Sequence, residues 1–384
     1  MISINLALIA FLSFLLKKSG QLNRELFSGF SRNDNIALII LALITLPMFI
    51  FASLYPNGGW DAWGTWNTKA HFLFSGGTHW TNMFDHAAWR TQVLYPFLLP
   101  LINVWGWCFG HTTTYIVPLA MTCIIPFLTA GILYTGLKEL TGKNMILLLA
   151  PAWIFTNMFT IELSASQYSD LLGGLFLLTS ITLFLFFQRT KDTGYLKLMG
   201  LSLGMMAFTK VEGTALGLLS LLTAVLLIMT GQENKDTRLE AVIKLLVTAV
   251  LAMIPIIIFS LFYAPANGEI FINGLTSRDH PVTLERFWFI WRYYGIEFTH
   301  PKWNGLWIIL LGGILLGMKN SWRRELWIFP IVLGGYFIIF TGSYNINTFY
   351  EMVWWVTTSL NRVIFALIPT LTLWAFLAVT RAER

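Results

Sequence analysis

Residues 36–66 of the chain read Ile36-Ala-Leu-Ile-Ile-Leu-Ala-Leu-Ile-Thr-Leu-Pro-Met-Phe-Ile-Phe-Ala-Ser-Leu54-Tyr55-Pro-Asn-Gly-Gly-Trp-Asp-Ala-Trp-Gly-Thr-Trp66. The part from Ile36 to Leu54 is almost entirely apolar. As a helix it would be roughly 28 Å long, close to the thickness of the hydrocarbon core of a bilayer. A polar, aromatic segment follows at once and places a carboxylate, Asp61, among three tryptophans. The stretch therefore predicts a transmembrane helix that ends in a polar site at the membrane surface.

The rest of the 384-residue chain has the composition of a polytopic membrane protein. Hydrophobic residues make up 56% and charged residues only 11%, with a mean hydropathy of +0.66, whereas soluble domains carry roughly 25% charged residues. The apolar runs are continuous rather than alternating, so we expect helices and not barrel strands. Cys108 and Cys123 are too few for a disulfide framework. The net charge of +6 reflects loop lysines and arginines and indicates no nucleic-acid partner.

Apolar runs place candidate membrane spans along the whole chain. They are 2–16, 36–54, 115–137, 145–162, 170–187, 195–209, 211–230, 245–264, 303–318, 325–341 and 361–379. The first run lacks the charged start and small-residue cleavage site of a signal peptide.

The run 93–109 is ambiguous, because it contains Pro96 and Pro100. If it lies on the outer surface, most of the 25 lysines and arginines fall inside, as the positive-inside rule requires. We therefore predict an all-α polytopic membrane protein with one transmembrane domain over 1–384 and a cytoplasmic C-terminus. It would have about 11 crossings and two external loops, 55–114 with juxtamembrane helices and 265–302.

Charged residues at the membrane boundary gather on the predicted external side. Asp61, Asp170, Lys210, Glu212 and Arg362 each lie at an external end of a predicted span, and all six histidines fall on that side too. The cytoplasmic loops are short and basic. Charges at the membrane boundary are energetically costly, and where several of them converge they usually mark a functional site. We therefore predict that the functional site lies on the external side.

Asp61 is the first candidate catalytic residue. A general base for a hydroxyl acceptor would be a carboxylate held near the membrane surface, where a lipid donor and its acceptor meet. Trp60, Trp63 and Trp66 would then stack on the apolar face of a sugar or line the path of the lipid. The alternative is an interfacial aromatic belt with a helix-capping aspartate.

Asp170 follows Ser164-Ala-Ser-Gln-Tyr-Ser169 and opens an apolar helix. It is the second candidate catalytic residue, and a helix N-cap is the alternative.

Lys210 and Glu212 lie in the predicted turn Phe208-Thr-Lys-Val-Glu-Gly213. The lysine could neutralise a phosphate while the glutamate orients it. A local salt bridge that closes a hairpin is the alternative.

Arg362 ends the segment Thr357-Thr-Ser-Leu-Asn-Arg362 at the outer start of the last predicted span. Its guanidinium could donate two parallel hydrogen bonds to a lipid phosphate. The alternative is an arginine that snorkels to the headgroups.

The loop 265–302 contains Arg278-Asp-His280 and then an aromatic segment, 283–294, with two arginines. It predicts an interfacial helix, and a lid over the site is the alternative. His79 and His86 have no third ligand placed by spacing, so we expect no zinc site. We expect no cofactor, although a divalent cation between Asp61 and Asp170 stays open. The chain has no glycine loop of the nucleotide-binding type, which disfavours a nucleotide-sugar donor.

Several stretches resemble the GT-C superfamily of integral-membrane glycosyltransferases, in particular bacterial relatives of the protein mannosyltransferase group. Trp60-Asp-Ala-Trp-Gly-Thr-Trp-Asn-Thr-Lys-Ala70 is similar to the first external loop, which holds an acidic catalytic residue in that family. Tyr95-Pro-Phe-Leu-Leu-Pro100 resembles the juxtamembrane helix that follows. Tyr168-Ser-Asp170 resembles the second acidic position. Thr209-Lys-Val-Glu-Gly213 and Thr358-Ser-Leu-Asn-Arg362 look like polar turns of the bacterial branch. The resemblance implies a GT-C-like helix bundle.

Residues and resemblance together predict a glycosyltransferase at the outer face of a bacterial cytoplasmic membrane. It would move a hexosyl or pentosyl group, with inversion, from a polyprenyl-phosphate donor to an acceptor hydroxyl on a glycan, lipid or protein. Asp61 would be the general base, and Asp170 would position the acceptor or the Asp61 loop. The predicted substrate-binding residues are Trp60, Trp63, Trp66, Lys69, Tyr95, Lys210, Glu212 and Arg362.

Two alternatives remain. A transporter or flippase for a lipid-linked or soluble sugar would have midplane charges and broken helices in paired halves. A polysaccharide polymerase or ligase would have an arginine-rich external loop, for which 265–302 is a small candidate. The sequence has no clear internal repeat and its polar landmarks lie on one predicted face, which favours the transferase.

Overall fold

The computed structural model describes residues 31–85, 92–142, 145–265, 283–346 and 351–380, and every regular element in these ranges is helical. The helices are α3 (Arg32–Leu54), η1 (Ala62–Trp66), α4 (Asn67–Ser75), η2 (Gly77–Phe84), α5 (Leu98–Gly110), α6 (Ile116–Thr141), η4 (Met145–Leu148), α7 (Leu149–Phe155), α8 (Met158–Ala165), α9 (Asp170–Thr190), α10 (Gly194–Ala207), α11 (Val211–Met229), α12 (Lys235–Ile258), η5 (Phe259–Tyr263), α14 (Leu284–Thr299), η6 (Pro301–Trp303), α15 (Leu306–Leu316), α16 (Met318–Ser321), η7 (Arg324–Leu326), α17 (Ile328–Ile346), α18 (Met352–Phe365) and α19 (Ile368–Val379).

Six helical segments of the described chain are long and apolar enough to cross a membrane. They are α3, α6, α9, α11, α12 with η5, and η7 with α17, which correspond to the predicted spans 36–54, 115–137, 170–187, 211–230, 245–264 and 325–341. The number rises to eight if each of two bent helix pairs is one span. The chain is therefore an all-α, multi-pass membrane protein, as predicted.

The predicted count of about 11 crossings stays a prediction. The span 2–16 lies outside the described residues. The spans 195–209 and 303–318 correspond to α10, with 14 residues, and α15, with 11 residues. At 1.5 Å per residue these helices are only about 21 and 17 Å long, too short to cross a bilayer core without their flanking turns.

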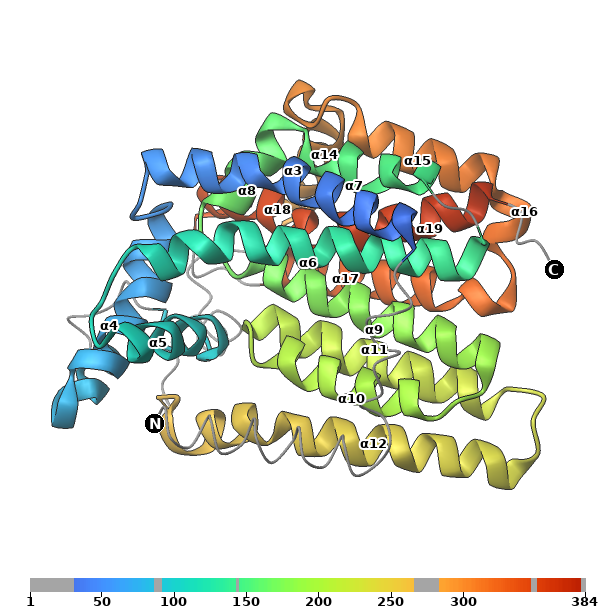
Figure 1. Ribbon diagram of the computed structural model, residues 1–384, viewed down its shortest axis with the longest axis horizontal. Helices are drawn as coiled ribbons and strands as arrows, with labels where there is room; N and C mark the ends of the chain where they lie inside the picture. The colour runs from blue at the N-terminus through green and yellow to red at the C-terminus, as the bar shows by residue number, and fades with distance from the viewer. Residues whose placement is uncertain (1–30, 86–91, 143–144, 266–282, 347–350, 381–384) are drawn as a thin grey trace.

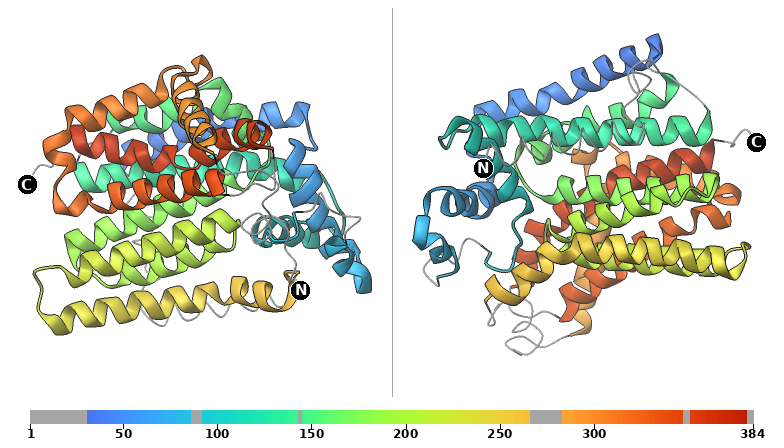
Figure 2. Two further views of the ribbon diagram at one scale, coloured as in Figure 1. Left: turned by 180° about the vertical axis from the view of Figure 1, so that it is seen from behind. Right: turned by 60° about the horizontal axis from the view of Figure 1, so that its bottom comes forward.

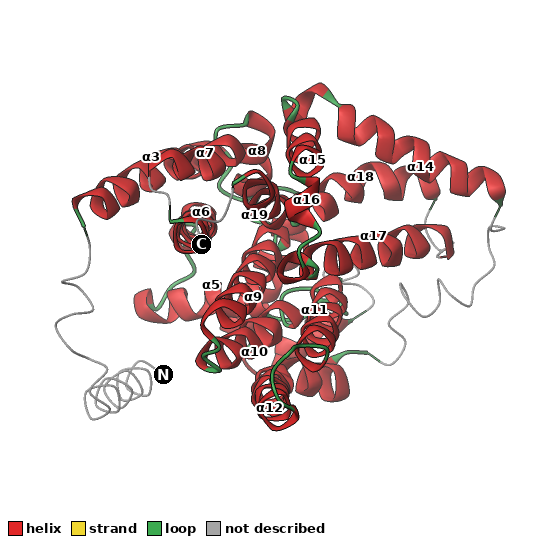
Figure 3. Cartoon of the chain, turned by 90° about the vertical axis from the view of Figure 1, so that its right-hand side faces the viewer, coloured by secondary structure: helices red, strands yellow, loops and turns green. Residues whose placement is uncertain are grey.

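The long helices lie side by side, and α4 and α5 lie together at one end of them (Figure 1). Seen along the bundle, α6, α9, α10, α12 and α19 are nearly end-on, while α14, α17 and α18 extend to one side (Figure 3). Helix α10 packs against α9, α11 and α12 (Figure 2). Most of the apolar part of α9 is buried, more than in any other candidate span. Because Asp170 is the first residue of α9, this candidate catalytic residue lies at one end of the most buried candidate span of the bundle.

Two of the predicted spans contain a bend, which their apolar runs did not predict. The segment 145–162 breaks by 71° between α7 and α8. The side chain of Asn157 caps the new helix by accepting hydrogen bonds from the backbone N–H groups of Phe159 and Thr160. The segment 361–379 is the end of a longer pair, α18 and α19, bent by 48°. Pro369 stands at the start of α19, where its missing N–H is tolerated.

The ambiguous run 93–109 forms α5, a helix of 13 residues. Its length of roughly 20 Å is too short to cross a bilayer, and it packs against α4 at the end of the bundle. Both features agree with the prediction that this run does not cross.

Candidate active site: a charge cluster at one end of the bundle

The five charged residues singled out in the sequence come together at one place. Arg362 Nη1 lies 2.5 Å from Asp61 Oδ2, although 301 positions separate the two residues. Lys210 Nζ lies 3.1 Å from Asp170 Oδ1 and 3.3 Å from Glu212 Oε1. Arg362 also attracts Asp170, which links the two groups of charges. The predicted convergence of these residues is thus present, whereas the side of the membrane on which they lie stays a prediction.

The cluster has an inner and an outer pair. The side chains of Lys210 and Asp170 are only 9% and 7% exposed, whereas those of Arg362 and Asp61 are 17% and 21% exposed. Buried charges are tolerated when they are paired and hydrogen-bonded. The inner pair, Lys210 and Asp170, therefore has a structural role, and the more exposed outer pair, Arg362 and Asp61, is the part that a ligand can reach.

Asp61 is positioned by a loop that docks against the turn before α9. The backbone N–H of Gly59 donates to the carbonyl of Ser166 over 3.0 Å. A Cβ at Gly59 would lie 2.2 Å from the hydroxyl oxygen of Tyr168, so a larger residue there would displace the Tyr168 ring. The ring of Tyr168 in turn lies 4.8 Å from the guanidinium carbon of Arg362. The same contacts thus hold both members of the outer pair.

The capping alternative for Asp61 was wrong. Its side chain makes no helix-capping hydrogen bond, and its carboxylate is paired with Arg362 instead. Directly after Asp61, residues Ala62–Trp66 form a π-helical turn inside the helix that continues as α4. Such turns frequently occur at functional sites.

A chain of three amides supports this loop, and sequence reasoning missed it. Gln167 Nε2 donates to the carbonyl of Pro56 over 3.0 Å, and Asn67 Nδ2 donates to Gln167 Oε1 over 2.9 Å. Asn103 Nδ2 then donates to Asn67 Oδ1 over 3.0 Å. Gln167 adopts a left-handed backbone conformation with φ +59°, which costs energy in a non-glycine residue. The available signal was the presence of amides in otherwise apolar surroundings.

Asp170 and Lys210 are brought together by two helix starts. Asp170 is the first residue of α9, but the capping residue Ser169 accepts no backbone hydrogen bond through its side chain. Lys210 precedes α11 in an extended conformation, and the turn before it is tight, because a Cβ at Gly213 would lie 2.2 Å from the carbonyl of Met206. Lys210 binds Asp170 as well as Glu212, so the alternative of a purely local salt bridge does not describe it.

Tyr95 joins the cluster from the loop before α5. Its ring lies 5.3 Å from Lys210 Nζ, and its hydroxyl oxygen lies 3.5 Å from Glu212 Oε1. Its other face stacks on Trp66 at 5.4 Å. Burial, together with the nearby Glu212, raises the pKa of the Tyr95 phenol, which therefore stays protonated and can donate a hydrogen bond.

Two predicted substrate contacts do not fit the geometry. Trp66 is buried behind Tyr95, so it cannot present its face to a sugar, whereas Trp60 and Trp63 are exposed and lie edge to face at 4.6 Å. Lys69 is fully buried and donates to the carbonyls of Gln92 and Tyr95 over 2.9 and 2.5 Å. Burial holds the pKa of Lys69 well below its ordinary value. Both residues position the loop that carries Tyr95.

The second predicted external loop contributes α14 and η6, while Arg278 and His280 lie outside the described residues, as does His86. Helix α14 exposes Leu284 and Trp288, as an interfacial helix would. Arg286 is buried and donates to the carbonyl of Tyr344 over 3.0 and 2.8 Å. This anchor fixes α14 to α17, and the lid role stays a prediction.

Several buried polar atoms of the cluster and of residues next to it in the sequence have no hydrogen-bond partner in the described part of the protein. They are Ser169 Oγ, Glu212 Oε2, Asn361 Oδ1 and Arg362 Nε. No group of three or more His, Cys, Asp or Glu side chains in this part of the chain could hold a metal ion. The unpaired atoms include both hydrogen-bond donors and acceptors, which suits a polar ligand with hydroxyl groups and an anionic group.

Comparisons of the chain with protein-family models, curated proteins and solved structures found no match. The resemblance to the GT-C superfamily therefore stays a hypothesis that rests on the residues themselves.

Proposed function

We propose that the protein is a glycosyltransferase that uses a polyprenyl-phosphate-linked sugar at the outer face of a bacterial cytoplasmic membrane. The observation that carries the proposal is the outer pair: a carboxylate, Asp61, and an arginine, Arg362, meet at 2.5 Å at one end of an apolar bundle. Two exposed indoles, Trp60 and Trp63, flank Asp61 in the sequence and contact each other edge to face. A base, a cation with the geometry of a phosphate ligand and aromatic surfaces are the groups that such a transfer requires.

The proposed reaction begins when the donor phosphate takes hydrogen bonds from Arg362. The guanidinium has five N–H donors in a fixed fork, and its Nε is buried without a partner in the protein. As the guanidinium turns to the phosphate, Asp61 is released from its salt bridge. Its carboxylate then takes the proton of the acceptor hydroxyl. The acceptor oxygen bonds to the anomeric carbon from the face opposite the phosphate, and the bond between that carbon and the phosphate oxygen breaks.

The charge balance of the cluster supports this order of events. Three carboxylates and two cations leave one net negative charge, which favours proton acceptance by the cluster. The proton neutralises Asp61, the carboxylate nearest Arg362. At the same time, negative charge develops on the leaving phosphate, so Arg362 is free to stabilise it. Lys210 is paired with both Asp170 and Glu212, so this inner group carries the net negative charge of the cluster. The Tyr95 hydroxyl is available to orient the sugar.

Mass spectrometry of lipids that co-purify with the protein in mild detergent tests the proposal. Wild type should retain a polyprenyl monophosphate or its hexosyl or pentosyl form, and Arg362→Ala should lose it. Arg292→Ala is the matched control, because Arg292 is exposed on α14. Retention of a pyrophosphate-linked oligosaccharide would instead favour a polymerase or flippase. Identical bulk phospholipid in wild type and Arg362→Ala would overturn the phosphate-binding role of Arg362.

A further inference from the structure

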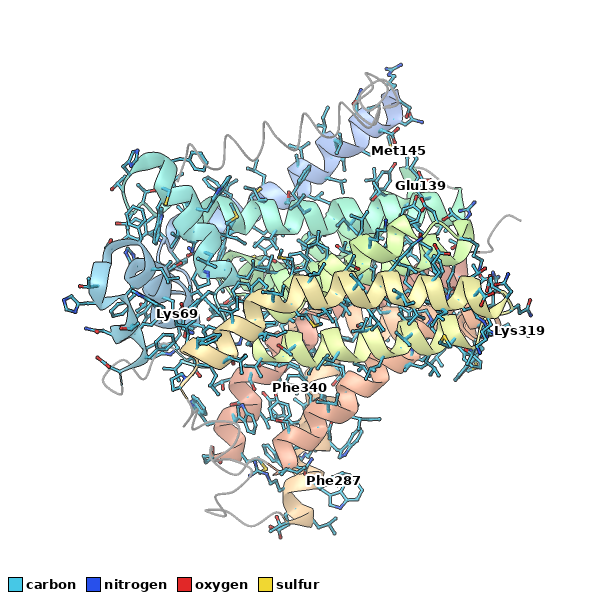
Figure 4. The ribbon with its side chains drawn as sticks, turned by 90° about the horizontal axis from the view of Figure 1, so that it is seen from below. Lys69, Glu139, Met145, Phe287, Lys319 and Phe340 are labelled. Carbon is cyan, nitrogen blue, oxygen red and sulfur yellow. The ribbon has the colours of Figure 1, made fainter. Side chains whose placement is uncertain are left out.

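A cavity lies at the end of the bundle opposite the charge cluster. Figure 4 shows the two ends, with Lys69 at one and Glu139 and Lys319 at the other. The cavity has a volume of about 320 Å³ and is open to one side. Its wall comes from the C-terminal ends of α9 and α11, the N-terminal part of α12, and η7. This volume is at the lower end of the range for small-molecule sites.

The cavity has an apolar floor and a cationic rim. Phe184, Phe187, Leu227, Ile228 and Ala241 form the floor. The rim carries Lys191, Arg238 and Arg324 against two carboxylates, Glu233 and Glu325, so its formal charge is one net positive. The three cations come from three separate parts of the chain.

Each arginine uses part of its guanidinium to hold the end of α11. Arg238 Nη1 donates to the carbonyls of Met229 and Gly231, the latter at 3.3 Å. Arg324 Nη2 donates to the carbonyl of Thr230 and to its hydroxyl at 2.8 Å. These bonds fix the guanidinium planes at the rim. Because a guanidinium has five N–H donors, fixed donors are left over for another acceptor.

Two polar atoms in the cavity wall have no protein partner. Arg238 Nε, a donor, and Gln188 Oε1, an acceptor, are both buried and unpaired. The positive charges of the rim already stabilise one anion, the carboxylate of Glu233. Lys191 donates a hydrogen bond to it over 2.6 Å, and this bond, together with the attraction of Lys191 and Arg238, lowers the pKa of Glu233. A ligand that satisfies both atoms would accept a hydrogen bond from Arg238 and donate one to the Gln188 amide oxygen.

We propose that this cavity is a second ligand site, which binds a phosphate ester that carries hydroxyl groups. A phosphate oxygen would accept from Arg238 Nε, and a hydroxyl would donate to Gln188 Oε1. A phosphoglycerol group has this chemistry, either as the headgroup of phosphatidylglycerol or as free glycerol 3-phosphate. The apolar floor gives room for the first carbons of a lipid chain.

The site is distinct from the proposed catalytic centre. Helix α9 begins at Asp170 and its C-cap is Lys191, so the two sites are separated by its length of roughly 30 Å. Helix α11 likewise links Lys210 to the cavity wall. This distance matches the thickness of a bilayer core, which places the cavity at the other membrane surface.

Binding of the two phosphoglycerol probes to the full-length protein in mild detergent tests the proposal. Short-chain phosphatidylglycerol and glycerol 3-phosphate are titrated separately, with phosphatidylcholine as the reference lipid, and the dissociation constant is measured from tryptophan fluorescence. Arg238→Gln and Arg324→Gln should each weaken binding about tenfold, because each removes a charge-assisted hydrogen bond. Arg323→Gln is the matched control, since Arg323 is adjacent in sequence but bonds to Asn320 outside the cavity wall.

Glu233→Gln keeps the test decisive if an arginine variant fails to fold. It removes a competing carboxylate from the rim, so the probe should bind several-fold more tightly, which is a gain that misfolding cannot produce. Binding of the lipid alone assigns the site to a membrane lipid, and binding of glycerol 3-phosphate with equal affinity assigns it to a soluble ester. The proposal is overturned if neither probe binds better than phosphatidylcholine, or if Arg323→Gln weakens binding as much as Arg238→Gln.

Discussion

Replacing Lys210 with methionine should destabilise the protein strongly. Lys210 Nζ lies 3.1 Å from Asp170 and 3.3 Å from Glu212, and the lysine and Asp170 are almost completely buried. At an effective dielectric constant of about 20, each contact has a Coulomb energy of roughly 5 kcal/mol. The cost of desolvating the charges offsets much of this attraction. Removal of one partner from such a buried pair typically costs about 3–5 kcal/mol, and we expect Lys210→Met to lie in that range.

A double-mutant cycle isolates this interaction. Denaturant unfolding in detergent is compared for wild type, Lys210→Met, Asp170→Asn and the double variant. Lys210→Met leaves the Asp170 carboxylate without its cation, and Asp170→Asn removes that carboxylate. The double variant should therefore be at least about 2 kcal/mol more stable than the sum of the two single effects predicts. Lys138→Met is the control, because its bridge to Asp34 is more exposed and should be worth about 1 kcal/mol or less. A coupling energy below about 0.5 kcal/mol would refute the reasoning.

Three further predictions concern the parts around the cluster. Gly174→Ala should lower the free energy of unfolding by about 1–3 kcal/mol, because a Cβ there would lie 2.5 Å from the carbonyl of Ala366 at the bend between α18 and α19. Gly131→Ala is the control and should cause no such loss, because the space around Gly131 is open. Equal effects of the two substitutions would contradict this packing. Burial lowers the pKa of Lys69, so the unfolded state binds more protons and stability should rise as the pH increases toward the ordinary lysine pKa of about 10.4. This gain should shrink in Lys69→Met, and an unchanged pH profile would count against a lowered pKa of Lys69. Arg362→Lys keeps the charge but loses the fork, so kcat/KM for sugar transfer should fall at least about tenfold; a wild-type value would show that charge alone suffices.

The long spans could be predicted because their apolar runs are uninterrupted. Helices α3, α9 and α11 correspond closely to 36–54, 170–187 and 211–230. The bends were not predicted, because hydropathy alone does not detect a polar cap within an apolar run. The side chain of Asn157 caps the start of α8 through two hydrogen bonds, just after α7 has ended at Phe155.

The charged residues of the site could be predicted because a charge at the membrane boundary is energetically costly and usually marks a functional site. Their partners could not, since the pairing of Asp61 with Arg362 spans almost the whole chain. The burial of Trp66 and Lys69 was missed for a related reason. Both residues occur in a polar, aromatic segment that suggests exposure, but the loop around Tyr95 covers them.

Transfer activity of Asp61→Asn is the most direct test of the central claim. Labelled sugar is transferred from the polyprenyl-phosphate donor that co-purifies with the protein, and donor retention is measured on the same preparations. Asp85→Asn is the control, because Asp85 is an exposed aspartate in the same predicted external loop. Loss of a general base should lower kcat by about 10²–10⁴-fold, with donor retention close to that of wild type and of Asp85→Asn. Transfer by Asp61→Asn at the wild-type rate would contradict the role of Asp61 as the base.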